Sequence, residues 1–189
     1  MKNVLDAAAE LQKFCEDQDW RFCFIGGIAV QRWSQPRFTH DADMTLLAGI
    51  GSEEKFVDLL LTKYLARFPG EREFALGARV LRIISAAGIP LDVALGALPF
   101  EERTIERASR WKAQRALVPL ITCSAEDLIV HKAFAGRKQD WIDLEGVLIR
   151  QGRALKIEQI WEELKPLVAL KEEPEILVKL QKIFDQHLD

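Results

Sequence analysis

The sequence predicts an α+β protein, in which a small mixed β-sheet with flanking helices is followed by a helical C-terminal region. Two observations lead to this prediction. Short runs of branched and aromatic residues, bounded by Gly and Pro, are confined to the first two thirds of the 189 residues. From Ser124 to the end, apolar residues instead recur at helical spacing. We therefore divide the chain into a core, residues 1–122, and a helical region, residues 123–189, packed on the core.

The core segments alternate between helical and strand periodicity. Helically spaced apolar residues predict an opening helix, and the dense apolar run from Trp20 to Ile25 predicts a buried strand. Ser52 can cap a helix, and Ala87-Gly88 can form the turn of a hairpin. In chain order, we expect a helix over 4–17, a strand over 20–25, a short helix over 28–33, a strand over 40–47, a helix after Ser52, strands over 79–86 and 90–96, a helix over 100–110 and a short strand over 117–122.

Ser124 opens the helical region, because Ser124 and Asp127 have the spacing of a capping box. Three more apolar stripes follow, and Pro166 is expected to end the second of them. The stripes consist of Trp141, Leu144 and Leu148; of Ile157, Ile160, Trp161 and Leu164; and of Ile176, Leu177, Leu180, Ile183 and Phe184.

Composition limits the classes of function. The formal charge of −3 gives no global attraction to nucleic acid. Three scattered cysteines, Cys15, Cys23 and Cys123, indicate buried, reduced thiols and neither a disulfide framework nor a zinc site. No apolar run reaches transmembrane length, and the first residues lack the apolar segment of a signal peptide. We expect a cytoplasmic protein without a membrane partner.

Three acids in apolar surroundings form the candidate site. Asp41 and Asp43 are two apart on a predicted strand, so their side chains share a face, and Asp92 lies in another strand-like run. Buried acids are costly unless they are paired or bind a metal. Converging carboxylates are the ligands that Mg²⁺ requires in phosphoryl transfer, where two metal ions stabilise the entering and leaving oxygens. The sequence therefore predicts a Mg²⁺-dependent phosphoryl-transfer site, with Asp92 also able to accept a proton.

Gly26-Gly27 supplies the second feature of this site. The pair follows the first strand and precedes a short helix, so its backbone N–H groups can approach a triphosphate at a helix N-terminus. Simpler interpretations exist for each part, because Asp-x-Asp and Gly-Gly are common in strand ends and turns. Asp92 could also be held by a salt bridge to Arg79 or Arg82.

In order along the chain, Gly26-Gly27-Ile28-Ala29, Arg37 to Asp43 and Asp92 resemble the nucleotidyltransferase (DNA polymerase β-like) superfamily. Within it, the chain looks most similar to AbiEii and MenA-type nucleotidyltransferases of toxin–antitoxin systems. Ser124 to Ala133 and Arg137 to Leu144 are similar to that group's helical lysine followed by Arg and Asp. The resemblance covers about residues 20 to 150, and it implies a nucleotidyltransferase core with a helical C-terminal extension.

The resemblance also implies roles for nine residues. Asp41, Asp43 and Asp92 would bind Mg²⁺ and act in catalysis with an NTP substrate. The remaining six would bind the nucleotide: Gly26, Gly27, Arg37, Thr39, Lys132 and Asp140. One departure is that many members have Gly-Ser where this chain has Gly26-Gly27, which removes a hydroxyl contact to phosphate.

The helical residues have simpler interpretations. Lys132 follows Leu128 by one helical turn and could extend past the core to solvent. Asp140 and Asp143 could lie on an exposed helix face beside Arg137. A basic stretch could guide RNA, although interspersed glutamates make a solvated helix the simpler interpretation; it consists of Arg103, Arg107, Arg110, Lys112 and Arg115.

Three functions are compatible with these features. The first is transfer of a nucleoside monophosphate from an NTP to a hydroxyl of tRNA, a protein or a small molecule, in a protein that could have a toxin or antitoxin partner. The second is a non-catalytic antitoxin or interaction protein that uses the same fold. The third is a metal-dependent phosphate-ester hydrolase that uses the same three acids.

Overall fold

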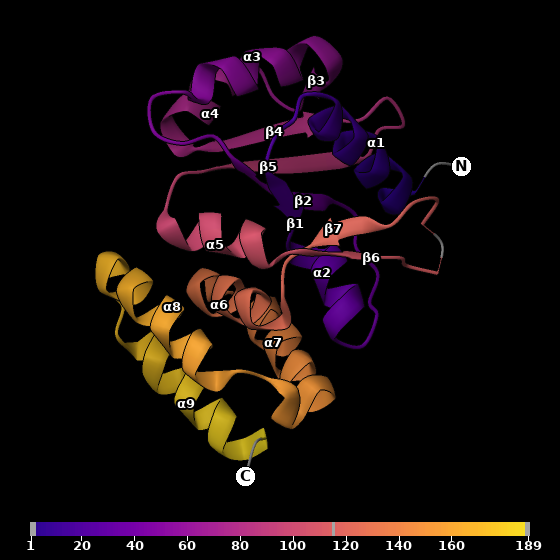
Figure 1. Ribbon diagram of the computed structural model, residues 1–189. Coiled ribbons are helices and arrows are strands. Elements are labelled where there is room, and N and C mark those ends of the chain that lie inside the picture. The colour runs from indigo at the N-terminus through magenta and orange to yellow at the C-terminus, as the bar shows by residue number, and fades with distance from the viewer. Residues whose placement is uncertain (1–2, 115, 188–189) are drawn as a thin grey trace. The chain divides into compact units, whose positions relative to one another are not determined.

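A computed structural model describes residues 3–114 and 116–187 (Figure 1). The chain forms two compact units. The sheet unit comprises Met1–Ile28 and Phe38–Cys123, and the helical unit comprises Ala29–Arg37 and Ser124–Asp189. Helix α2 (Gly26–Trp33) therefore begins in the sheet unit, and its residues from Ala29 onward belong to the helical unit.

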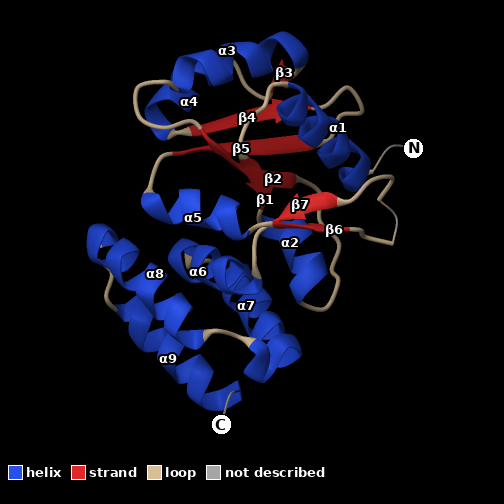
Figure 2. Ribbon diagram, in the orientation of Figure 1, coloured by secondary structure: helices blue, strands red, loops and turns tan. Residues whose placement is uncertain are grey.

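A mixed β-sheet forms the centre of the sheet unit (Figure 2). Its strands lie in the order β3-β4-β5-β2-β1-β7-β6, with β2 parallel to β5, β1 parallel to β7 and the other neighbours antiparallel. The strands are β1 (Phe22–Phe24), β2 (Ala42–Leu47), β3 (Leu65–Ala66), β4 (Val80–Ile84), β5 (Pro90–Gly96), β6 (Ser109–Trp111) and β7 (Leu120–Thr122).

Helices supply the rest of the apolar core of this unit. Helix α1 contacts β2 and β7, α4 contacts β4, and α5 contacts β1 and β2. Phe24, Met44 and Leu91 are fully buried on the central strands, which is the pattern of strands covered by neighbouring helices. The helices are α1 (Val4–Asp17), α3 (Glu53–Lys63), α4 (Glu71–Ala78) and α5 (Pro99–Arg107).

The helical unit is built from the C-terminal helices. Ser124 caps the first of them, because its side chain accepts a hydrogen bond of 3.1 Å from the backbone N–H of Asp127. Residues 29–37 join this unit through side-chain bonds; one is the 2.8 Å bond from Gln151 Nε2 to the Trp33 carbonyl. The helices are α6 (Ala125–Ala135), α7 (Lys138–Gln151), α8 (Ile157–Lys171) and α9 (Glu175–His187), with a 3₁₀ turn at Gly152–Ala154.

The predicted α+β class with a mixed sheet is confirmed. Pro166 does not end its helix, because α8 continues to Lys171. A proline inside a helix removes one hydrogen bond and costs about 3 kcal/mol. Leu164, Leu167 and Val168 are buried on both sides of Pro166, and their packing offsets this cost. The sequence prediction also missed α4, β3 and β6.

Within the described residues, no helix combines the length and the apolar character needed to cross a membrane. The three cysteines are buried free thiols. Burial raises the pKa of the Cys15 thiol to about 12, so this group stays protonated at neutral pH.

Candidate functional site

Sheet register brings the three predicted acids together. Strands β2 and β5 are parallel neighbours in which Asp43 lies directly opposite Asp92. Asp41 precedes β2 by one residue, so the strand starts later than predicted, yet its carboxylate still meets the others. One carboxylate oxygen from each of the three acids lies within 4.8 Å of the others. We call this cluster the carboxylate triad.

The triad has the chemistry of a site for a hard divalent cation. Its side chains are half-buried, so a cation can reach them from solvent. Three carboxylates at this separation repel one another, and oxygen ligands of this kind suit Mg²⁺. Burial raises the pKa of Asp92, and the charge of Asp41 acts in the same direction, although the Arg67 guanidinium opposes both. A bound cation would relieve this repulsion, so the residues fit the metal that the sequence predicts.

Gly26 is required for the packing of the triad. It has a φ of +54°, which is unfavourable for residues with a side chain, and a Cβ there would lie 1.9 Å from Asp43 Oδ2. The preceding backbone is also fixed to this acid, because the Ile25 N–H donates to the Asp43 carbonyl at 3.0 Å. Helix α2 begins at Gly26, two residues earlier than predicted, so the helix N-terminus adjoins Asp43.

Gly27 and Thr39 share a second close contact. A Cβ at Gly27 would lie 2.3 Å from Thr39 Oγ1, so the threonine hydroxyl fills the space that a side chain at position 27 would need. Thr39 is buried, and its hydroxyl donates to Asp41 Oδ1 at 3.0 Å. Thr39 therefore orients one acid of the triad.

Arg67 is the site residue that the sequence analysis missed. Arg67 immediately follows the two-residue strand β3, and its Nη2 donates a hydrogen bond to Asp92 Oδ1. The alternative partners considered for Asp92 were wrong, because Arg79 pairs with Glu53 and Arg82 pairs with Glu71. A strand as short as β3 has no periodicity that could have revealed its pairing.

The predicted residues Lys132, Asp140 and Arg37 lie in the helical unit. Lys132 is 7% exposed, and its Nζ lies 2.7 Å from Asp140 Oδ1 and 2.9 Å from Asp143 Oδ2. Arg37 forms two bonds to the Asp143 carboxylate, of 2.7 and 2.8 Å. Arg137 also donates to Asp140, at 2.7 Å. We call these five residues the ion network.

The two acids of the ion network are buried, and each of them is paired with cationic side chains. Asp140 and Asp143 are only 2% and 3% exposed, so the exposed helix face considered for them was wrong. Burial opposes the charged form of Asp143, but hydrogen bonds from Arg37, Lys132 and Gln139 outweigh it and lower the pKa to about 2. Burial also opposes ionisation of Asp140, and bonds from Lys132 and Arg137 lower its pKa. Nucleotide binding by Lys132, Asp140 and Arg37 stays a prediction.

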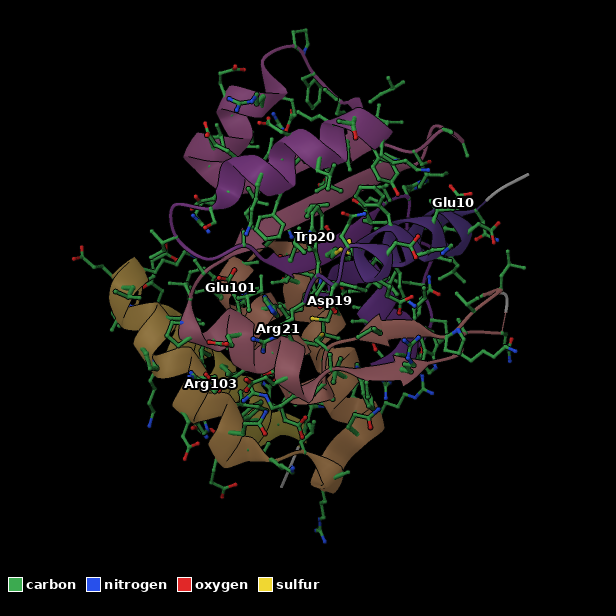
Figure 3. All side chains as sticks on the ribbon, turned by 45° about the horizontal axis from the view of Figure 1, so that its top comes forward. Glu10, Asp19, Trp20, Arg21, Glu101 and Arg103 are labelled. Atoms are coloured by element: carbon green, nitrogen blue, oxygen red, sulfur yellow. The ribbon has the colours of Figure 1, made fainter. Side chains whose placement is uncertain are left out.

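The basic stretch near α5 is interspersed with acids that form ion pairs. Arg21 lies beside α5 (Figure 3). Its guanidinium contacts Glu102 at 3.0 Å and Glu106 at 3.4 Å, both of which belong to α5. Arg110 pairs with Glu16 at 2.8 Å. Arg115 lies outside the described residues.

Comparisons with known proteins reveal similarity at the level of the fold. No protein-family model and no curated protein sequence matches the chain. Among solved structures, an antigenic nucleotidyltransferase-like protein from Paracoccidioides brasiliensis is 13% identical with a TM-score of 0.50, over 94% of this chain and 92% of that one. The antibiotic-resistance factor ANT(2'')-Ia is 12% identical with a TM-score of 0.52, over 94% of this chain and 96% of that one. At such identities the likeness shows the fold, and membership of the toxin–antitoxin branch stays a prediction.

Proposed function

We propose that this chain, which has a nucleotidyltransferase fold, is a Mg²⁺-dependent enzyme that moves a nucleoside monophosphate from an NTP to a hydroxyl acceptor. The single observation that carries the proposal is the carboxylate triad, whose oxygens lie within 4.8 Å of one another. Its position next to Gly26, at the start of α2, supports the same proposal.

The triad would hold two Mg²⁺ ions, which supply the positive charge that phosphoryl transfer requires. In the proposed reaction, the acceptor oxygen forms a bond to the α-phosphorus of the NTP. The bond from that phosphorus to the bridging oxygen breaks, and pyrophosphate leaves with the electron pair. Asp92 accepts the hydroxyl proton, a role that its raised pKa supports.

Other residues of the chain would bind and orient the nucleotide. The backbone N–H groups of Gly26 and Gly27 would approach the triphosphate, because these residues form the N-terminus of α2. Thr39 would keep the Asp41 carboxylate in place through its 3.0 Å bond. Contacts of Arg37, Lys132 and Asp140 with the nucleotide are also part of the proposal.

The acceptor would be a tRNA, a protein side chain or a small molecule. Likeness to an antibiotic-resistance factor supports including small molecules among the acceptors tested. The resemblance to toxin–antitoxin nucleotidyltransferases supports a cytoplasmic protein with a toxin or antitoxin partner.

Label transfer tests the proposed activity. The protein is incubated with Mg²⁺, each NTP labelled at the α-phosphate, and bulk tRNA, protein or small-molecule extract. We expect incorporation of label with one or more NTPs, and its loss in Asp41→Asn. The matched control is Asp58→Asn, which removes an exposed acid paired with Arg72. Equal transfer by wild type and Asp41→Asn would contradict the proposal.

Two further measurements exclude the other functions. Calorimetry with Mg²⁺ and NTP would show no binding to a non-catalytic interaction protein, whereas we expect binding that Asp43→Ala abolishes. Release of free phosphate without incorporation of label would indicate a hydrolase.

A further inference from the structure

We propose that Arg67 is a positioning residue that holds the Asp92 carboxylate turned toward the other acids of the carboxylate triad. This inference rests on the metal site of the proposed function. It adds a residue outside the sequence motif and assigns it a measurable effect on cation binding.

Pairing within the sheet fixes the backbone position of Arg67. Its backbone N–H donates to the Arg82 carbonyl at 2.9 Å, directly after β3. Arg82 lies opposite Asp92 on β5, and Asp92 lies opposite Asp43 on β2. These four residues therefore form a row across four neighbouring strand positions. The row carries two positive charges at one end and two negative charges at the other.

Glu71 determines which arginine donates a hydrogen bond to Asp92. Its buried carboxylate accepts two bonds of 3.0 Å from the Arg82 guanidinium and one of 2.9 Å from the Arg82 backbone N–H. The same guanidinium lies over the rings of Phe74, at 3.8 Å, and Phe68, at 4.7 Å. Arg82 is thus held by Glu71 and two aromatic rings. The hydrogen bond to Asp92 comes from Arg67.

Packing alone does not explain the position of the Arg67 side chain, because burying part of its guanidinium is unfavourable. Its Nε is buried without a hydrogen-bond partner among the described residues, and an unsatisfied buried donor destabilises a fold. The interaction that offsets this cost is the bond from Nη2 to Asp92 Oδ1. A carboxylate has two oxygens, so Asp92 can keep this bond and offer Oδ2 to a cation.

Two physical effects of removing Arg67 oppose each other. Loss of a positive charge next to the triad would strengthen cation binding by electrostatics alone. Loss of the hydrogen bond would free the Asp92 carboxylate to rotate away from the other acids, which weakens cation binding. Groups that orient metal ligands typically contribute about tenfold or more to affinity. We infer that orientation outweighs charge at this site.

Calorimetric titration with Mn²⁺, in the absence of nucleotide, tests the inference. We expect Arg67→Gln to bind Mn²⁺ about tenfold more weakly than wild type, and Arg67→Lys to regain part of the loss. Arg72→Gln is the matched control, because Arg72 pairs with the exposed Asp58 and we expect its removal to leave Mn²⁺ affinity unchanged. Circular dichroism at the titration temperature confirms that each variant is folded.

The outcomes separate this inference from the proposed function. Unchanged or tighter Mn²⁺ binding by Arg67→Gln overturns the role of Arg67 while leaving the metal site intact. Failure of wild type to bind Mn²⁺, or equal binding by Asp41→Asn, overturns the metal site and this inference together.

Discussion

The carboxylate triad and the ion network are both clusters of charged side chains, but their charge balance differs. The triad has three acids and one arginine hydrogen-bonded to one of them, and its side chains are half-buried. The ion network has two buried acids bonded by three cationic side chains. A buried cluster needs internal compensation, whereas a partly exposed one can leave charge for a ligand to neutralise. This difference supports the proposal that the triad binds a cation, and it predicts that the ion network stabilises the helical unit.

The largest expected effect is on catalysis by the triad. Asp43→Asn should lower kcat/KM for nucleotide transfer about a thousandfold or more, because a metal ligand contributes several kcal/mol to the transition state. Its melting temperature without metal should stay equal or rise, since one repulsive charge is removed. Enzyme assays and thermal unfolding in EDTA measure both quantities. A marked fall in stability would contradict the contrast between the two clusters.

In the ion network, by contrast, we expect removal of an acid to lower stability. Asp143→Asn removes a buried partner of Lys132 and Arg37, and it should lower the free energy of unfolding by about 3–5 kcal/mol. Urea denaturation measures this change. Lys132→Met sharpens the comparison, because a normal stability combined with a raised KM for NTP would identify Lys132 as a nucleotide contact.

Gly26→Ala should have an intermediate effect. It combines an unfavourable positive φ with a Cβ that would lie 1.9 Å from Asp43 Oδ2. We expect a loss of about 2 kcal/mol in the free energy of unfolding, together with weaker Mn²⁺ binding. Gly88→Ala is the control, since Gly88 also has a positive φ, but a Cβ there would meet nothing within 4 Å in the described part of the chain. It should cost about 1 kcal/mol and leave Mn²⁺ binding unchanged.

The smallest expected effects are changes in pH dependence, and they have opposite signs in the two clusters. The pKa of Asp143 is lowered to about 2, so its contribution to stability is present above its ordinary pKa of 3.8 and is lost as pH falls toward 2. The pKa of Asp92 is raised, so its contribution is present below its ordinary value and is lost as pH rises through the folded-state value.

Urea denaturation in EDTA at a series of pH values measures these contributions. Relative to wild type, Asp143→Asn should lose less stability between pH 4 and pH 2. Asp92→Asn should lose less stability as pH rises above 4. If both variants lost less stability than wild type in the same direction of pH change, the two clusters would not differ in charge balance.

Local sequence patterns predicted the parts of the site that depend on local geometry. Asp41 and Asp43 are two residues apart, so one extended segment was enough to place them together. The hairpin containing Asp92 was also local, because Gly88 supplies the positive φ of its turn. These features required no knowledge of which distant segments pair.

Features that depend on long-range pairing were not predictable. The contact of Arg67 with Asp92 depends on β3, a two-residue strand that pairs with β4. Burial of Asp140 and Asp143 depends on Lys132 from another helix and on Arg37 from a segment about a hundred residues earlier. Continuation of α8 through Pro166 likewise depends on apolar contacts that the proline rule does not include.

Gly27 and Thr39 compete for the same space, so a side chain at position 27 requires Thr39 to move or to be replaced. A homologue that acquires serine at position 27 needs a smaller residue at position 39, and it then loses the hydroxyl that orients Asp41. The double substitution Gly27→Ser with Thr39→Gly would exchange one source of hydroxyl for the other. Each single substitution should destabilise the protein more than the double substitution does. Positions 27 and 39 would then be energetically coupled.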